Sequence, residues 1–115
     1  RITSYLIGHS DTDCLFGLGG ITTDRLTSSL KNAKKEPGQI FAGGFDATPG
    51  TLTGLKTDYM VASIDQQQYL QGYFSVYVLY LMKQYGFAPQ IDTGGYLITK
   101  DNIELIEKLS PQNIR

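Results

Sequence analysis

Two apolar runs of this chain each end in short polar side chains, and this pattern constrains the fold more than any other feature. The first run, Gln39-Ile40-Phe41-Ala42, leads into Gly44-Phe45-Asp46-Ala47-Thr48-Pro49. The second run, Tyr59-Met60-Val61-Ala62-Ser63, leads into Ile64-Asp65-Gln66-Gln67. Runs rich in β-branched and aromatic residues are typical of buried strands. The polar groups therefore fall at the carboxyl ends of two predicted strands, where an open α/β sheet binds its ligands.

Length and composition limit the chain to one small globular domain at most. It has 115 residues, of which 41% are hydrophobic and 18% charged, and this balance argues against disorder. The net charge is -1, with acidic and basic residues interspersed, which is not the pattern of a nucleic-acid-binding surface. The basic cluster at residues 31–35 is interpreted as a solvated helix end.

The single cysteine and the absence of a long apolar segment give further limits. Cys14 cannot form an intrachain disulfide, and its apolar neighbours predict a small core residue rather than a nucleophile. The stretch 69–82 is interrupted by Gln71, Gly72 and Ser75, so it is too short and too polar for a membrane span. The chain opens with neither methionine nor a signal peptide, and we expect a mature or internal segment.

Strands and helices are predicted to alternate along the chain. The predicted strands cover residues 2–7, 39–43, 59–64 and 95–99. The first helix is expected to start near residue 14, break near residue 20 and resume after residue 24 up to residue 35. Further helices are predicted over residues 49–57 and 68–85, and a last one from residue 100 to a point before Pro111. Thr48 and Pro49 form a helix-start pattern for residues 49–57, and Gly86 ends the helix predicted over residues 68–85. This alternation predicts a parallel α/β layer.

The helix predicted over residues 68–85 is the most apolar element of the chain. Its hydrophobic residues form one stripe at helical spacing, made of Leu70, Tyr73, Phe74, Tyr77, Val78, Leu81 and Tyr85. Further apolar residues extend this surface around the cylinder. A helix of this kind is expected to be covered on most sides.

Asp46 and Gln66 close two successive predicted strands, so we expect them side by side at one sheet edge. Asp11 follows the strand predicted before them, and Phe45 lies beside Asp46. A carboxylate accepts hydrogen bonds from neighbouring hydroxyls, and a glutamine amide both donates and accepts. Such groups hold a sugar ring without reacting with it. Helix capping is the alternative interpretation of Asp46 and of Asp11.

Other motifs give weaker chemical signals. His9-Ser10-Asp11 is contiguous in sequence, whereas a catalytic triad converges in space. Asp11-Thr12-Asp13 has no further acidic cluster or phosphate loop to support metal-assisted chemistry. Gly17-Leu18-Gly19-Gly20 fails the spacing of a dinucleotide-binding loop. The tyrosines at positions 69, 73, 77 and 80 are interpreted as core and interface. We predict no catalytic residue, no metal site, no cofactor and no enzymatic activity.

Several motifs resemble type I periplasmic sugar-binding proteins of the ribose, xylose and simple-sugar ABC transporter family. Gly44-Phe45-Asp46-Ala47-Thr48-Pro49 resembles their "GFDGTP", and the segment 64–73 resembles an "IDQQPYLQGY" branch. Residues 92–102 resemble the end of that branch. Residues 11–17 are similar to the family's "NDEMALG", although about ten extra residues separate Asp11 from Asp46. The resemblance covers nearly the whole chain.

The resemblance implies a binding function and a set of contacts. Asp46 and Gln66 fall on sugar-contacting positions of the family, and Asp11 falls on a position that is usually asparagine. The implied protein has two lobes that close on a neutral monosaccharide, such as ribose, xylose, glucose or galactose, and deliver it to an ABC importer permease. The implied location is periplasmic or extracytoplasmic.

The resemblance also implies an incomplete α/β fold, a parallel-sheet (Rossmann-like) lobe with a hinge-crossing helix. Residues 1–66 would form part of the C-terminal sugar-binding lobe. Residues 67–93 would cross the hinge and pack on an N-terminal lobe absent from this chain, and residues 94–115 would return. The expected partner is therefore the missing lobe or a second chain.

Two other readings share this fold class. One is the effector-binding lobe of a sugar-responsive LacI-type repressor, which would need a DNA-binding helix-turn-helix upstream. The other is a flavodoxin-like enzyme, which is disfavoured because the chain shows no nucleophile or phosphate loop.

Overall fold

The computed structural model describes residues 1–109 and 112. A four-stranded sheet in the order β1-β2-β3-β4 forms its centre. Its strands are β1 (Cys14–Phe16), β2 (Phe41–Phe45), β3 (Ala62–Asp65) and β4 (Tyr96–Ile98). The pairs β1–β2 and β2–β3 are parallel, whereas β4 runs antiparallel to β3. The prediction of a parallel α/β layer is confirmed for β1, β2 and β3, whereas the antiparallel direction of β4 was not predicted.

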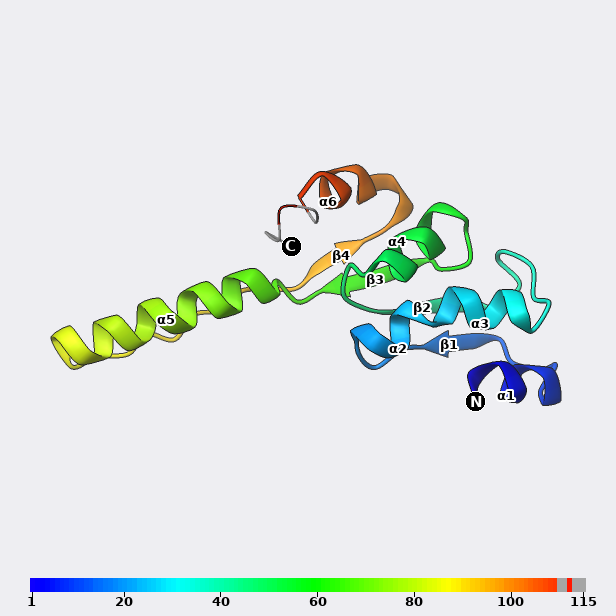
Figure 1. Cartoon of the computed structure of the whole chain (residues 1–115), viewed down its shortest axis with the longest axis horizontal. Coiled ribbons are helices and arrows are strands. Elements are labelled where there is room, and N and C mark those ends of the chain that lie inside the picture. Colours follow the sequence, from blue (N-terminus) through cyan, green and yellow to red (C-terminus); the bar gives the residue numbers. More distant parts are fainter. Residues whose placement is uncertain (110–111, 113–115) are drawn as a thin grey trace.

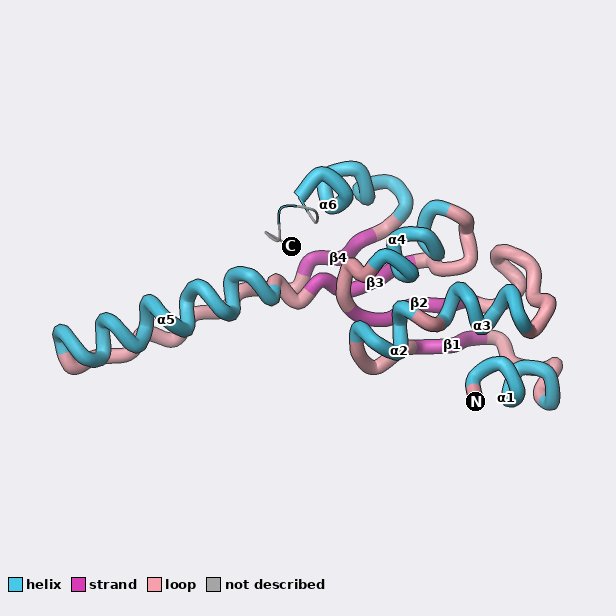
Figure 2. The backbone as a smooth tube through the Cα atoms, in the orientation of Figure 1, coloured by secondary structure: helices cyan, strands magenta, loops and turns pink. Residues whose placement is uncertain are grey.

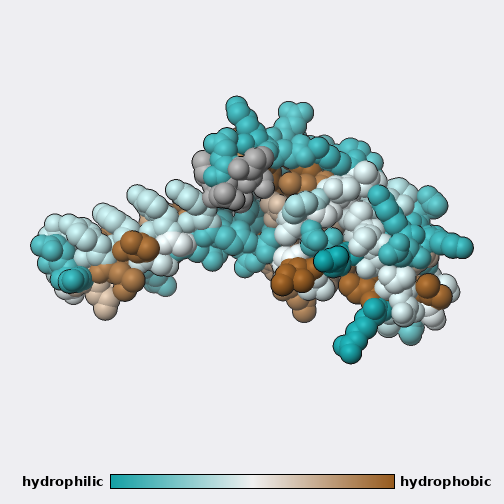
Figure 3. All heavy atoms as spheres, viewed as in Figure 1, coloured by the Kyte–Doolittle hydropathy of each residue, from teal (hydrophilic) through white to brown (hydrophobic). Residues whose placement is uncertain are grey.

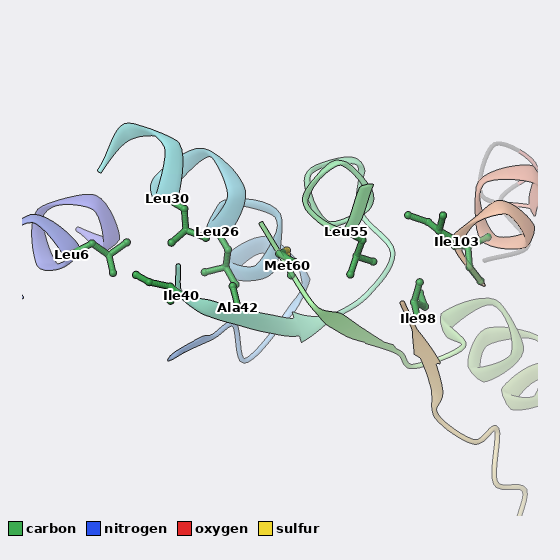
Figure 4. Close-up of a cluster of buried hydrophobic side chains, with 10 residues drawn as sticks. Leu6, Leu26, Leu30, Ile40, Ala42, Leu55, Met60, Ile98 and Ile103 are labelled. Atoms are coloured by element: carbon green, nitrogen blue, oxygen red, sulfur yellow. The ribbon is translucent and has the colours of Figure 1, made fainter. Parts of the chain in front are cut away.

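Helices cover one face of this sheet (Figure 1). They are α1 (Ile2–Gly8), α2 (Gly20–Asp24), α3 (Leu26–Asn32), α4 (Pro49–Lys56) and α6 (Ile103–Leu109), which follows the short 3-10 turn η1 (Lys100–Asn102). The buried side chains gather between these helices and the sheet (Figure 4). The buried core consists of Leu6, Leu26, Leu30, Ile40, Ala42, Leu55, Met60, Ile98, Ile103 and Ile106.

The opposite face of the sheet carries exposed apolar side chains. Strand pairing places Phe16 beside Gly43 and Leu97 beside Ile64, and Phe41 lies two residues before Gly43 on the same face. Phe16, Phe41 and Leu97 are each more than half exposed. Parallel sheets are normally covered on both faces. The residues that the structure describes therefore form one of the two helical layers expected for such a sheet.

Helix α5 (Gln68–Tyr85) projects from this body. The molecule measures 58 × 27 × 17 Å along its principal axes. Figure 2 shows the loop after α5 returning alongside the helix to β4. No residue of α5 is buried, and apolar side chains lie open on this arm (Figure 3). Among residues 1–109 and 112, no helix combines the length and hydropathy needed to cross a bilayer.

The helices α4 and α5 confirm predictions made from local signals. The Thr48 hydroxyl accepts a hydrogen bond from the Thr51 amide at 3.4 Å, and Pro49 occupies the first helical turn. Helix α5 has the predicted bounds, and its C-cap Gly86 has a left-handed φ of 75°. The terminal helix also forms and reaches Leu109, although Pro111 lies outside the described residues.

The first sixteen residues contradict two predictions. Residues 2–7, expected as a strand, belong to helix α1, because the apolar run is too short for its period to distinguish helix from strand. Residue 14 begins strand β1 rather than a helix, since residues 14–16 pair with β2. Cys14 is exposed and is not the core residue that we predicted.

We predict that Gly54→Ala destabilises the fold by about 1–3 kcal/mol, a range typical of overpacking. An added Cβ would contact the Thr27 hydroxyl and lie 2.8 Å from the Met60 sulfur, where α4 packs on α3. Gly8→Ala is the control, because a Cβ there meets no atom within 4 Å. Urea unfolding followed by circular dichroism measures both variants, and equal midpoints would contradict the prediction.

Candidate functional site

The carboxyl ends of the three parallel strands meet at one edge of the sheet. Phe16 ends β1, Phe45 ends β2, and Gln66 directly follows β3. Since β4 is antiparallel, its first residue, Tyr96, pairs with Asp65 at this same edge. The edge therefore gathers residues from four separate segments of the chain. We call it the carboxyl edge.

The backbone of Asp46 is hydrogen-bonded to β3. Its amide donates to the Ile64 carbonyl at 2.8 Å, and its carbonyl accepts from the buried Ser63 hydroxyl at 2.8 Å. Its φ of 71° lies in the left-handed region, which aspartate tolerates better than most residues with a side chain. The backbone thus fixes the direction in which the carboxylate leaves β2.

The Asp46 carboxylate is held by two glutamine amides. Gln66 Nε2 donates to Asp46 Oδ1 at 2.9 Å, and Gln68 Nε2 donates to the same oxygen. The prediction that Asp46 and Gln66 lie side by side is therefore confirmed. Their contact with a ligand stays a prediction.

A tight turn connects β3 to α5 beside this carboxylate. Gln67 adopts a left-handed φ of 59°, and its amide donates to Asp65 Oδ1 at 3.0 Å. Gln71, one turn into α5, donates from Nε2 to the Gln66 carbonyl at 2.6 Å. The first turn of α5 is thus hydrogen-bonded to the groups that surround Asp46.

Two phenylalanines pack at the carboxyl edge, on the face of the sheet that the helices leave open. The rings of Phe16 and Phe45 are 5.7 Å apart and nearly perpendicular, at 85°. Phe16 is 54% exposed, so part of its ring remains available to a ligand. Sequence reasoning named Phe45 but missed Phe16. The signal for Phe16 is a short apolar run that ends at a glycine-rich loop.

Thr23 joins the glycine-rich loop after β1 to the end of β2. Its hydroxyl lies 3.3 Å from the Gly17 carbonyl and 2.9 Å from the Gly19 carbonyl, to which it donates. The same oxygen accepts from the Phe45 amide at 3.0 Å. Thr23 is fully buried. Thr23 therefore fixes the position of the loop relative to the carboxyl edge. No feature of the sequence predicts this role.

The structure does not bring Asp11 to this edge. Because residues 2–8 form a helix, Asp11 follows no strand and precedes β1. It therefore lies toward the amino-terminal end of β1, away from Asp46 and Gln66, and our placement of Asp11 beside them is wrong. His9 Nδ1 bonds to the Tyr5 carbonyl at 2.9 Å rather than to a serine. Within residues 1–109 and 112, no cluster of acidic, His or Cys side chains could hold a metal ion.

Comparison with known proteins gives one curated relative. The chain is 31% identical to a xylose/arabinose-binding protein of Sulfolobus acidocaldarius, over 90% of this chain and 27% of that protein. No protein-family model matches.

Solved structures share the fold. An ABC transporter solute-binding protein of Agrobacterium vitis with bound D-fucose matches with a TM-score of 0.80 and 28% identity, over 98% of this chain and 38% of that one. A solute-binding protein of Burkholderia graminis in complex with D-arabinose matches with a TM-score of 0.79 and 26% identity, over 89% of this chain and 37% of that one. A carbohydrate transporter of Acidothermus cellulolyticus in complex with myo-inositol matches with a TM-score of 0.84 and 22% identity, over 99% of this chain and 40% of that one. At this identity the match shows a shared fold.

The chain is similar, over nearly its whole length, to part of the sugar-binding proteins of ABC transporters. The family resemblance seen in the motifs is thereby confirmed. The chain spans 27% of the curated relative's length and between 37% and 40% of these three structures. The relatives named here are sugar-binding and transport proteins rather than enzymes, in agreement with what the motifs implied.

We predict that Thr23→Val lowers the free energy of unfolding by about 1–3 kcal/mol, because the partly buried Phe45 amide loses its acceptor, the buried Thr23 hydroxyl. Thr53→Val is the matched control. Its hydroxyl bonds to the Pro49 carbonyl on the exposed side of α4, so we expect a change within about 0.5 kcal/mol. Urea titration of both variants tests this, and similar losses would show that Thr23 has no special role.

Proposed function

We propose that this chain forms part of a substrate-binding component of an ABC importer for a neutral monosaccharide, such as ribose, xylose, glucose or galactose. The observation that carries the proposal is the Asp46–Gln66 pair at the carboxyl edge. Asp46, Gln66 and Phe45 are the proposed ligand contacts, and Phe16 joins them from its position. We expect the intact protein to work in the periplasm or another extracytoplasmic space.

The chemistry of the carboxyl edge suits a polyhydroxylated ring. The Asp46 carboxylate accepts hydrogen bonds from hydroxyl groups, and such bonds to a charged acceptor are stronger than neutral ones. Its negative charge also disfavours anionic ligands such as sugar phosphates. The Phe16 and Phe45 rings offer an apolar surface to the C–H face of a ring. The bound molecules named for the structural relatives, D-fucose, D-arabinose and myo-inositol, are all neutral.

The second half of the proposed binding site comes from a lobe outside this chain. Helix α5 presents large apolar side chains to solvent, with Tyr73 58%, Val76 71% and Leu79 64% exposed. A groove between α5 and the returning loop is lined by Phe74, Val78, Leu79, Pro89 and Ile91, among others. We propose that residues 67–93 cross a hinge and pack on that lobe, and that residues 94–115 return to the lobe formed with residues 1–66.

A repressor effector lobe is not proposed, because the relatives named above are transport proteins. The importer permease is the further partner that the proposed function requires.

We predict that the intact protein binds one or more neutral monosaccharides and that Asp46→Asn reduces the affinity about 10- to 100-fold, in keeping with loss of a charge-assisted hydrogen bond. Calorimetric titration against xylose, arabinose, ribose, glucose, galactose and inositol measures this. Asparagine keeps the size of the side chain and tolerates the left-handed backbone.

Asp58→Asn is the matched control for this experiment. Asp58 also has a left-handed φ, of 59°, but its carboxylate pairs with Lys100 at 2.6 Å on the exposed surface. We expect unchanged affinity in this variant. Full affinity in Asp46→Asn would reject the site, and no binding by the unmodified protein would reject the function.

We predict that residues 1–115 expressed alone self-associate, because the α5 arm and the open sheet face expose apolar side chains. Light scattering combined with mass spectrometry measures the assembly. A monodisperse, folded monomer would contradict the proposal that another lobe or chain covers these surfaces.

A further inference from the structure

Gly20 lies against the Asp46 carboxylate. It follows the glycine-rich loop and begins α2. A Cβ at this position would collide with Asp46 Oδ2 and would lie 3.2 Å from Cγ and 3.3 Å from Cβ of the same residue. The backbone of Gly20 is not in the left-handed region. The glycine is therefore required for space rather than for backbone conformation.

The two oxygens of the Asp46 carboxylate have different surroundings. Oδ1 accepts from both Gln66 and Gln68, which occupies its two lone pairs. Oδ2 accepts no hydrogen bond from any residue that the structure describes, and it faces Gly20. Oδ2 is therefore the oxygen that remains available to a ligand.

The carboxylate cannot easily move away from an obstacle at Gly20. The backbone of Asp46 is hydrogen-bonded on both sides to β3, through Ile64 and Ser63. Its side chain is held by the two glutamine amides. A methyl group at position 20 would consequently turn the carboxylate and break at least one of these bonds.

We propose that Gly20 is a positioning residue for Asp46: its lack of a side chain lets the carboxylate keep the orientation in which Oδ1 meets the two glutamine amides and Oδ2 faces the proposed ligand site. This inference rests on the proposed sugar-binding function and specifies how the carboxyl edge performs it. The absence of a side chain at Gly20 keeps Oδ2 open and holds Oδ1 against the glutamines. The ligand then meets a backbone surface, rather than a polar side chain, on the Gly20 side of Asp46.

Gly19 provides a matched control one residue away. A Cβ at Gly19 meets no atom within 4 Å, and its φ of 176° is extended backbone that any residue adopts. Alanine at position 19 therefore adds the same methyl group to the same loop without touching Asp46.

The test is calorimetric titration of the intact protein, its Gly20→Ala variant and its Gly19→Ala variant with the sugar that the unmodified protein binds best. We expect Gly20→Ala to weaken binding at least about tenfold and Gly19→Ala to change it less than about twofold. Equal affinity of Gly20→Ala and the unmodified protein would overturn this inference and leave the proposed function standing. No binding by the unmodified protein would overturn both.

A second measurement separates positioning from a general structural role and needs no ligand. Asp46→Gly removes the side chain that Gly20 faces and keeps the left-handed backbone permitted. We expect Gly20→Ala to lower the melting temperature in the unmodified background and not in the Asp46→Gly background. If Gly20→Ala alone does not fold, Asp46→Gly should restore folding. The same loss in both backgrounds would overturn the inference.

Discussion

The hydrogen bonds that join Asp46, at the end of β2, to β3 are the constraint on which the rest of the site depends. Its amide and carbonyl both bond to β3, so the chain leaves β2 in one direction only. This direction places the carboxylate against the amides of Gln66 and Gln68. A left-handed aspartate costs conformational energy, which the two backbone bonds offset. The backbone hydrogen bonds to β3 thus determine where the side chains of the site lie.

Close helix packing, permitted by glycines, brings the other groups to the same edge. Because Gly50 has no side chain, α2 packs close enough to α4 for the Gly50 amide to donate to Asp24 Oδ1 at 2.8 Å. Gly54 in turn lies against Thr27. The helices of this layer therefore pack closely against one another and against the sheet. Because of this, the buried Thr23 hydroxyl can reach both the glycine-rich loop and the end of β2. A larger residue at either glycine would raise the helices and loosen the loop that faces Asp46.

The sequence could predict the elements that local chemistry specifies, and not those that distant pairing specifies. The adjacent residues Thr48 and Pro49 define the start of α4, and Gly86 defines the end of α5. In contrast, β1 has only three residues and exists as a strand through its pairing with β2, 27 positions away. Reading residues 2–7 as that strand also misplaced Asp11. Asp46 and Gln66 were predictable because polar residues end two long apolar runs, whereas the approach of Gly20 depends on packing that no local pattern encodes.

The turn at Gln67 connects the groups around Asp46 to the projecting helix α5, and hydrogen bonds hold the two together. Gln68, the first residue of α5, donates to the Asp46 carboxylate, and Gln71 donates to the Gln66 carbonyl. A rotation of α5 about this turn breaks both bonds and frees the groups that hold Asp46. Conversely, a ligand bound at the proposed contacts Asp46 and Gln66 would favour one direction of α5. If the proposed contacts bind a sugar, the same hydrogen bonds link the occupancy of the site to the direction of α5, and by thermodynamic reciprocity each then biases the other.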